Sequence, residues 1–148
     1  MPSITNGLFL VCPFSQMENF ITNHFGEVFI FTAPASIFSL EDKEAVDEMK
    51  IILRNERITD IYLAIDTGCR FIRNAIAGNN LPDFTCEEII AELKNANDDA
   101  FSLSRKIVLH QLKELNSAKL IAEEIKAFNI SLHGIVTSKK ENKAMKVS

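Results

Sequence analysis

The stretch Asp60-Ile61-Tyr62-Leu63-Ala64-Ile65-Asp66 decides the fold class of this 148-residue chain. The residues between its two aspartates are all apolar or aromatic, which is typical of a strand buried on both faces of a parallel sheet. Two buried-strand runs precede it, at 7–12 and 27–32, and amphipathic segments separate the three runs. This β-α-β-α-β order predicts a parallel sheet with right-handed crossovers.

Helical periodicity fills most of the remaining chain. Residues 40–57 carry one apolar stripe, with acidic residues near the start and Arg54 near the end, an arrangement that the helix dipole favours. Further helices are predicted at 69–77, from Thr85 to about Asn95, at 103–115 and at 120–128. A fourth strand is predicted at 130–136, and residues 143–148 could add a fifth, edge strand through a hairpin.

These segments predict a single α/β domain over residues 1–148. Its central sheet is mostly parallel and has four strands, with the fifth edge strand as an option, and helices lie on both faces. No internal repeat, low-complexity tract or linker-like stretch suggests a second domain.

Two sequence signatures locate helix starts. Ser15 followed by Glu18 forms a capping box and predicts a helix that opens directly after Cys12 and ends at Gly26. Thr85 followed by Glu88 has the same signature and predicts the start of the helix that runs to about residue 95.

Composition restricts the partners and the compartment. Sixteen Lys and Arg residues against twenty Asp and Glu residues give a net charge of −4, which repels nucleic-acid phosphates overall. Residues 1–14 have no basic region and only a strand-length apolar run, so we expect neither a signal peptide nor a membrane segment. Three unevenly spaced cysteines form no disulfide framework. A cytoplasmic protein that binds neither nucleic acid nor membrane is expected.

The carboxyl ends of the predicted strands are the first place to seek a site in a parallel sheet. Cys12 ends the first strand, and Asp66 and Cys69 lie at the end of the third. Thiolate and carboxylate are zinc ligands, so these three residues form a candidate metal site if the two strand ends meet. The glycine-rich phosphate-binding loops are missing from the sequence, so dinucleotide and P-loop functions are not supported.

At these residues the chain resembles the β-class carbonic anhydrases. In that family the first strand ends in Cys-x-Asp-x-Arg and the third in His-x-x-Cys-Gly, and two Cys and one His bind zinc. The matching segments here read Cys12-Pro13-Phe14-Ser15-Gln16 and Asp66-Thr67-Gly68-Cys69-Arg70. The resemblance extends over nearly the whole chain and implies the family's fold, a zinc site at Cys12, Asp66 and Cys69, and a homodimer.

The chain departs from the family at the residues that carry catalysis. Asp66 stands where the family has its zinc-binding His, and Phe14 and Gln16 replace the Asp and Arg of the catalytic dyad. Replacing imidazole by carboxylate raises the ligand charge from −2 to −3, so a bound zinc would acidify its water less. The resemblance therefore implies a carbonic-anhydrase-like protein with impaired or absent activity that could retain a metal site.

Several alternatives remain open from the sequence. The chain could be an active zinc-dependent carbonic anhydrase, a protein that uses thiol chemistry at Cys12, or an interaction protein on the same fold. A small molecule or anion could bind at the strand ends. Cys12 could also be a plain core residue, and Asp66 could simply cap the helix that begins near Cys69.

Overall fold

A computed structural model describes residues 6–79 and 84–148 of the protein. Within them, five strands form one sheet in the order β2-β1-β3-β4-β5. The strands are β1 (Gly7–Val11), β2 (Phe29–Thr32), β3 (Asp60–Asp66), β4 (Ser131–Ser138) and β5 (Lys143–Lys146). The pairs β1–β2, β1–β3 and β3–β4 are parallel, and β5 is antiparallel to β4. The predicted mostly parallel sheet and its optional edge strand are both confirmed.

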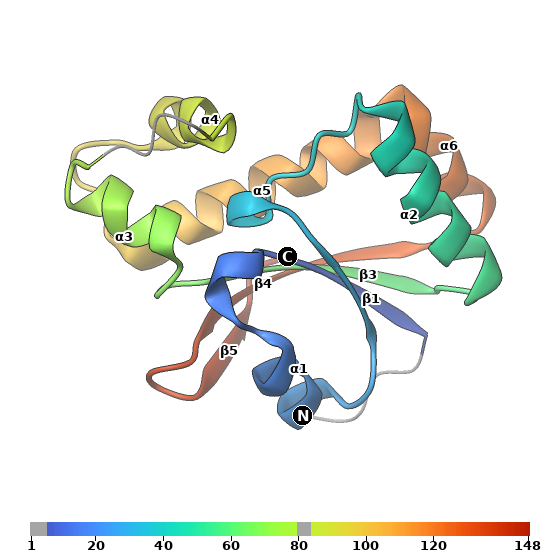
Figure 1. Ribbon diagram of the computed structural model, residues 1–148, viewed down its shortest axis with the longest axis horizontal. Helices are drawn as coiled ribbons and strands as arrows, with labels where there is room; N and C mark the ends of the chain where they lie inside the picture. The colour runs from blue at the N-terminus through green and yellow to red at the C-terminus, as the bar shows by residue number, and fades with distance from the viewer. Residues whose placement is uncertain (1–5, 80–83) are drawn as a thin grey trace.

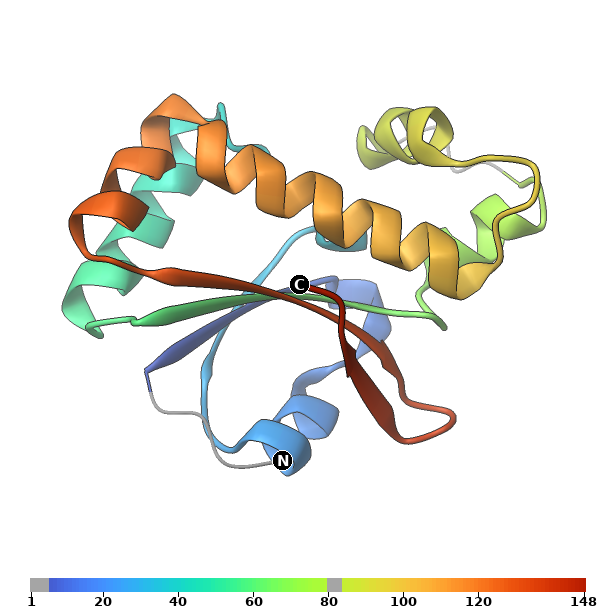
Figure 2. The ribbon, with the colours of Figure 1, turned by 180° about the vertical axis from the view of Figure 1, so that it is seen from behind.

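Helices lie on both faces of the sheet, but unequally (Figure 1). One face is covered by α1 (Glu18–Phe25). The other carries the remaining α-helices, as the reverse view also shows (Figure 2). These are α2 (Lys43–Asn55), α3 (Arg70–Ile76), α4 (Cys86–Leu93), α5 (Ala100–Ser117) and α6 (Lys119–Ala127). Two short 3-10 helices, η1 (Pro13–Ser15) and η2 (Pro34–Ser36), directly follow the β1 and β2 strand ends.

The strand side chains divide into two cores because successive residues of a strand face opposite sides. Leu8 and Leu10 of β1 belong to the larger core under α2 and α5, whereas Phe9 and Val11 belong to the α1 core. The same alternation continues in β3, where Ile61, Leu63 and Ile65 face the larger core and Ala64 faces the α1 core. The face of each strand residue therefore follows from its place in the sequence.

Both predicted capping boxes are wrong in detail. The helix expected directly after Cys12 begins only at Glu18, because η1 intervenes and Gln16 adopts a left-handed backbone with φ 49°. Ser15 therefore lies inside η1, and the N-cap of α1 is Met17, which makes no side-chain cap. Thr85 does precede α4, but its side chain makes no capping hydrogen bond either. Local signatures of this kind are overridden when a loop has other tertiary contacts.

The prediction that residues 27–32 form a buried strand is also wrong in part. This segment forms β2, which pairs only with β1 and is an edge of the sheet. Phe29 is 40% exposed, and the other β2 side chains are only partly covered. An apolar run alone cannot distinguish a central strand from an edge strand that is paired on one side only.

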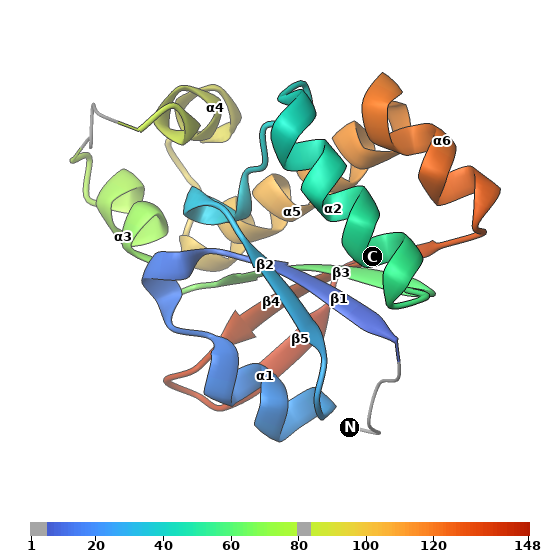
Figure 3. The same ribbon diagram turned by 45° about the vertical axis from the view of Figure 1, so that its right-hand side comes forward.

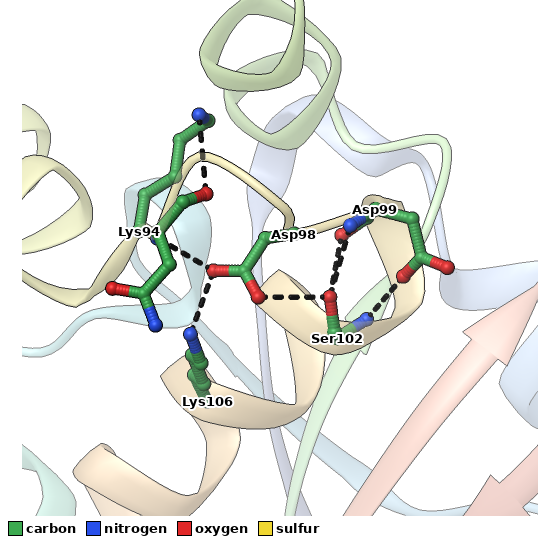
Figure 4. A network of polar contacts seen from close by, with 6 residues as sticks. Lys94, Asp98, Asp99, Ser102 and Lys106 are labelled. Carbon is green, nitrogen blue, oxygen red and sulfur yellow. Dashed lines mark hydrogen bonds and ion pairs between the residues drawn. The ribbon is translucent and has the colours of Figure 1, made fainter.

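A polar network fixes the start of the longest helix, α5 (Figure 4). Asp99 caps it by accepting from the Ser102 amide at 2.8 Å, and Ser102 Oγ accepts from the Asp99 amide at 2.9 Å. The Asp98 carboxylate accepts from the Asn95 amide and from Lys106 Nζ, both at 2.7 Å.

No helix in residues 6–79 and 84–148 combines the length and the apolar character needed to cross a membrane.

Candidate thiol site at the strand ends

The carboxyl ends of β1 and β3 lie at one edge of the sheet, where β1 continues into η1 and β3 into α3 (Figure 3). Two aromatic rings show how closely the following segments approach. Phe14, two residues after Cys12, contacts Phe71, two residues after Cys69, with 5.6 Å between ring centroids. The segments that directly follow β1 and β3 therefore contact each other, in line with the predicted approach of the two strand ends.

Cys12 is the last residue before η1, and its side chain is 2% exposed. Its sulfur accepts a hydrogen bond from the backbone amide of Ala35 at 3.1 Å. Ala35 presents that amide from η2 with a left-handed backbone, φ 55°, which is unfavourable for a residue with a Cβ atom. The loop after β2 is thus held in a costly conformation where it contacts Cys12.

Cys69 is the N-cap residue of α3, and its side chain is fully buried. Each of the two thiols, Cys12 and Cys69, is the largest influence on the pKa of the other. Donation from Cys69, which outweighs burial, lowers the pKa of Cys12 to about 6, and the same contact with burial raises the pKa of Cys69. Negative charge at this pair therefore resides on Cys12, while Cys69 keeps its proton.

Ser15 completes the surroundings of the two sulfurs. Its side chain lies near enough to both thiols to lower their pKa values, although it is not the main influence on either. Within the described part of the chain, Ser15 Oγ is buried and has no hydrogen-bond partner of normal geometry. A buried hydroxyl without a full partner is uncommon and marks a place where a ligand or intermediate could be held. The sequence signature assigned Ser15 to a helix cap and so missed this contact.

Asp66 ends β3, and its carboxylate is 3% exposed. Oδ1 accepts from Thr137 Oγ1 at 2.8 Å and from the Lys139 amide at 2.9 Å, while Oδ2 accepts from the Gly68 amide at 2.9 Å. These donors belong to the β4 end, to the hairpin before β5 and to the turn before α3. Asp66 therefore holds three segments together, and it does not cap α3 in the way the sequence allowed.

Strand alternation separates Asp66 from the thiols. Cys12 continues the β1 series that faces the larger core, where Cys69 also lies. Asp66 follows Ala64 in the β3 series that faces α1, and its partner Thr137 lies 3.8 Å from the sulfur of Met17 in the α1 core. The structure therefore brings Cys12 and Cys69 together but holds Asp66 in a different network.

The zinc site implied by the resemblance has two of its three donors in place. The Cys12 and Cys69 thiols are adjacent, but both oxygens of Asp66 are occupied by protein donors. Among residues 6–79 and 84–148, no three His, Cys, Asp or Glu side chains converge so as to hold a metal ion. In this arrangement the residues do not fit a three-ligand zinc centre, and the site at Cys12, Asp66 and Cys69 stays a prediction.

The side chains at the two dyad positions carry no charge. Phe14 is 44% exposed and packs edge-on against Phe71 and Phe84, with ring centroids 5.6 Å and 5.7 Å apart. The Arg70 guanidinium carbon lies 5.9 Å from the Phe14 ring. Gln16 is exposed and accepts from Lys139 Nζ through its backbone carbonyl at 3.4 Å. An aromatic cluster therefore stands beside the thiols where the family has a carboxylate.

A cavity between the helices on the larger-core face does not adjoin this site. It has a volume of about 680 Å³ and lies between the loop before α2 and the α5–α6 junction, with Phe38, His110, Glu114 and Lys119 among its lining residues. Neither of the two thiols nor Asp66 lines it.

Cys86, the third cysteine, is buried at the start of α4, and burial raises its pKa to about 11, so it behaves as an inert core thiol.

Comparison with known proteins bears on the fold. No family model and no curated protein sequence matches this chain. Solved structures do match. The β-carbonic anhydrase CafA of the fungal pathogen Aspergillus fumigatus has a TM-score of 0.73 at 16% identity, and the match covers 97% of this chain and 76% of that one.

Two further structures agree with this result. A Coccomyxa β-carbonic anhydrase in complex with acetazolamide has a TM-score of 0.73 at 17% identity, covering 97% of this chain and 72% of that one. A tetrameric β-carbonic anhydrase from Sordaria macrospora has a TM-score of 0.71 at 15% identity, covering 97% and 81%. The chain therefore has the β-carbonic anhydrase fold, as its strand-end motifs predicted.

Proposed function

We propose that this chain keeps the β-carbonic anhydrase scaffold without its hydration chemistry and carries a two-thiol centre, Cys12 and Cys69, in place of the zinc. The observation that carries the proposal is the bonding of Asp66, which stands at the position of the family's third zinc ligand. Its oxygens accept three hydrogen bonds from the protein. Binding a metal would require breaking these hydrogen bonds, one buried and two part-buried, at a cost of about 1 kcal/mol each.

The remaining replacements support the same proposal. When bound, zinc would supply a water acidic enough to form hydroxide near neutral pH. The family positions that water with a carboxylate, but Phe14 has no group that could accept its proton or hydrogen bond. Gln16 lies at the surface and engages Lys139 through its backbone. Neither residue can orient a nucleophile toward carbon dioxide.

Stopped-flow hydration of carbon dioxide tests the proposal. Protein dialysed against zinc should give a rate indistinguishable from buffer. The matched variant is Asp66→His, which restores the family's ligand type. Because residue 66 leaves the sheet on the face opposite the thiols, we expect this change alone to leave the hydration rate at that of buffer. A wild-type rate above that of buffer would overturn the proposal.

A second candidate, an active or inactive zinc site at Cys12, Asp66 and Cys69, is favoured by the contact between the two thiols. It requires Asp66 to leave its present partners. Elemental analysis of protein purified without added metal decides between the two, with Cys12→Ser as the control. About one zinc per chain that is lost in Cys12→Ser supports the zinc site, and zinc-free protein supports the two-thiol centre.

We also propose that the protein is a cytoplasmic homodimer. The Sordaria macrospora structure is described as tetrameric, so this fold supports oligomers. The exposed β2 edge with Phe29 offers this chain an apolar strand for pairing. All three cysteines are free thiols in the structure, which suits a reducing compartment. Sedimentation at micromolar concentration should give twice the chain mass, and a persistent monomer would exclude the dimer.

A further inference from the structure

We propose that the cavity at the corner between α5 and α6 binds a small zwitterion with an apolar body, the chemistry of a free aliphatic amino acid. The cavity has a volume of about 680 Å³, within the range of about 300–1,000 Å³ that small-molecule sites occupy. Neither Cys12 nor Cys69 lines it, so this site is independent of the two-thiol centre at the strand ends.

Two helix ends of opposite polarity meet at this cavity, where α5 runs into α6 (Figure 1). Ala118 is both the C-cap of α5 and the N-cap of α6, and it lines the cavity with Ser117 and Lys119. No side chain caps the start of α6. A helix C-terminus attracts cations and a helix N-terminus attracts anions. The corner therefore suits a ligand that carries one charge of each sign.

The charged side chains at the two helix ends strengthen this polarity. Glu114 lies in the last turn of α5 and Lys119 is the first residue of α6, and both line the cavity. Each charge has the same sign as the helix end that carries it, which is unfavourable for the helix. Among the ion pairs of the described chain, none joins Glu114 to Lys119. A ligand ammonium group beside Glu114 and a ligand carboxylate beside Lys119 would compensate both charges.

A buried amide supplies a further donor for the carboxylate. Gln111 of α5 lines the cavity and is only 2% exposed. Its Oε1 accepts from the Phe38 amide at 3.1 Å, which fixes the side chain. Its Nε2 makes no hydrogen bond with any described residue and stays open to the cavity. Buried donors normally have a partner, so a donor held in this way points to an acceptor on a bound molecule.

An apolar wall completes the cavity. Phe38 and Leu40 contribute from the loop before α2, Ile89 from α4 and Leu120 from α6. Such a wall suits an aliphatic side chain, which gains free energy by leaving water. A second carboxylate, that of Glu41, also lines the cavity and disfavours a ligand with a net negative charge, such as a phosphate ester. Leucine combines the ammonium group, the single carboxylate and the branched aliphatic body.

Calorimetric titration with three matched compounds tests the proposal. Isocaproate is leucine without the ammonium group, and isoamylamine is leucine without the carboxylate. Leucine should bind at least about tenfold more tightly than either, because each compound lacks one charge-assisted contact. Equal binding of isocaproate would make the cavity a simple anion site, and equal binding of isoamylamine a simple cation site. Either result, or no leucine binding at millimolar concentration, would overturn the proposal.

Two variants separate the charged ends of the ligand. Lys119→Gln should weaken the binding of leucine and isocaproate about tenfold and leave isoamylamine unchanged. Glu114→Gln should weaken leucine and isoamylamine and leave isocaproate unchanged. The matched controls are Lys113→Gln and Glu123→Gln, which remove the same charges from exposed positions of α5 and α6 outside the cavity. Leucine binding that falls equally in the controls would show a general charge effect and overturn the proposal.

Gln111→Glu tests the buried amide. The new side chain keeps an oxygen for the Phe38 amide but replaces the Nε2 donor by an acceptor. Leucine binding should fall at least about tenfold, whereas isoamylamine should bind no less tightly than to the wild type. Urea denaturation checks that the variant is folded, and the Lys119→Gln and Glu114→Gln titrations stand as the test if it is not. Unchanged leucine binding by folded Gln111→Glu would remove Gln111 from the proposed site.

Discussion

The ends of β1 and β3 are neighbours in the sheet, yet they use their polar atoms in opposite ways. At the β1 end, the pKa of Cys12 responds to the Cys69 thiol, to the backbone of Phe14 and Ala35, and to the Ser15 side chain, and the Ala35 amide donates to its sulfur at 3.1 Å. At the β3 end, Asp66 accepts three hydrogen bonds from well-placed donors. The Cys12 sulfur at the β1 end therefore remains available for a reaction, whereas the Asp66 carboxylate at the β3 end has a structural role.

The difference shows that position at a strand end does not by itself define a site. Both ends satisfy the rule that ligands bind outside the carboxyl edge of a parallel sheet. The two side chains nevertheless leave the sheet on different faces because strand residues alternate. Chemistry therefore concentrates where Cys12 and Cys69 share the larger core, and Asp66 serves the junction of β4, the hairpin and α3.

The largest expected effect on the free energy of unfolding follows from removing the Asp66 carboxylate. Asp66→Ala leaves the Gly68 and Lys139 amides and the Thr137 hydroxyl without their acceptor. We expect a loss of about 3 kcal/mol in the free energy of unfolding, measured by urea denaturation. Cys12→Ala is the matched change at the other strand end, and it should cost about 1–2 kcal/mol because it removes one weak acceptor. Equal losses would abolish the contrast between the two ends.

A smaller effect is expected at Gly68, which allows the Asp66 carboxylate to approach the backbone. A Cβ atom at Gly68 would lie 2.9 Å from Asp66 Oδ2, so the carboxylate would have to move. Gly68→Ala should destabilise the protein by about 1–2 kcal/mol. In an Asp66→Ala background the same change should cost close to nothing, because the clashing group is gone. A cost that persists in the double mutant would show that the carboxylate position is not the reason for glycine here.

The smallest effect is expected at Asp98, a carboxylate with several donors but more access to solvent (Figure 4). The Asn95 amide, followed by Lys106, lowers the pKa of Asp98 to about 2. Its folded pKa lies below the unfolded value, so its stabilisation is present above about pH 4 and is lost as the pH falls toward 2. The unfolding midpoint of Asp98→Asn should therefore lie below that of the wild type at pH 6 and converge with it near pH 2. A constant difference across this range would contradict the assignment.

Much of the fold could be predicted from the sequence because its signals are local. Each signal lies within a single strand or a few helical turns: the apolar runs of β1 and β3, and the apolar stripes of α2 and α5. Their apolar residues are the ones that the fold buries. The helix starts were less predictable. The Ser15–Glu18 pattern had the right residues for a capping box, but contacts with distant segments placed Ser15 in η1 beside the thiols.

The sequence by itself determined the sheet, its mostly parallel order, and the placement of Cys12, Asp66 and Cys69 near the strand ends. Only the tertiary structure decided which of these residues act together. Two of the donors that hold Asp66 are Thr137 and Lys139, which lie 71 and 73 residues further along the chain. Hydrogen bonds at that separation depend on how β4 and its hairpin align against β3, and no local pattern encodes that alignment. The surroundings of the two thiols are decided in the same way, by segments that lie far apart in the sequence.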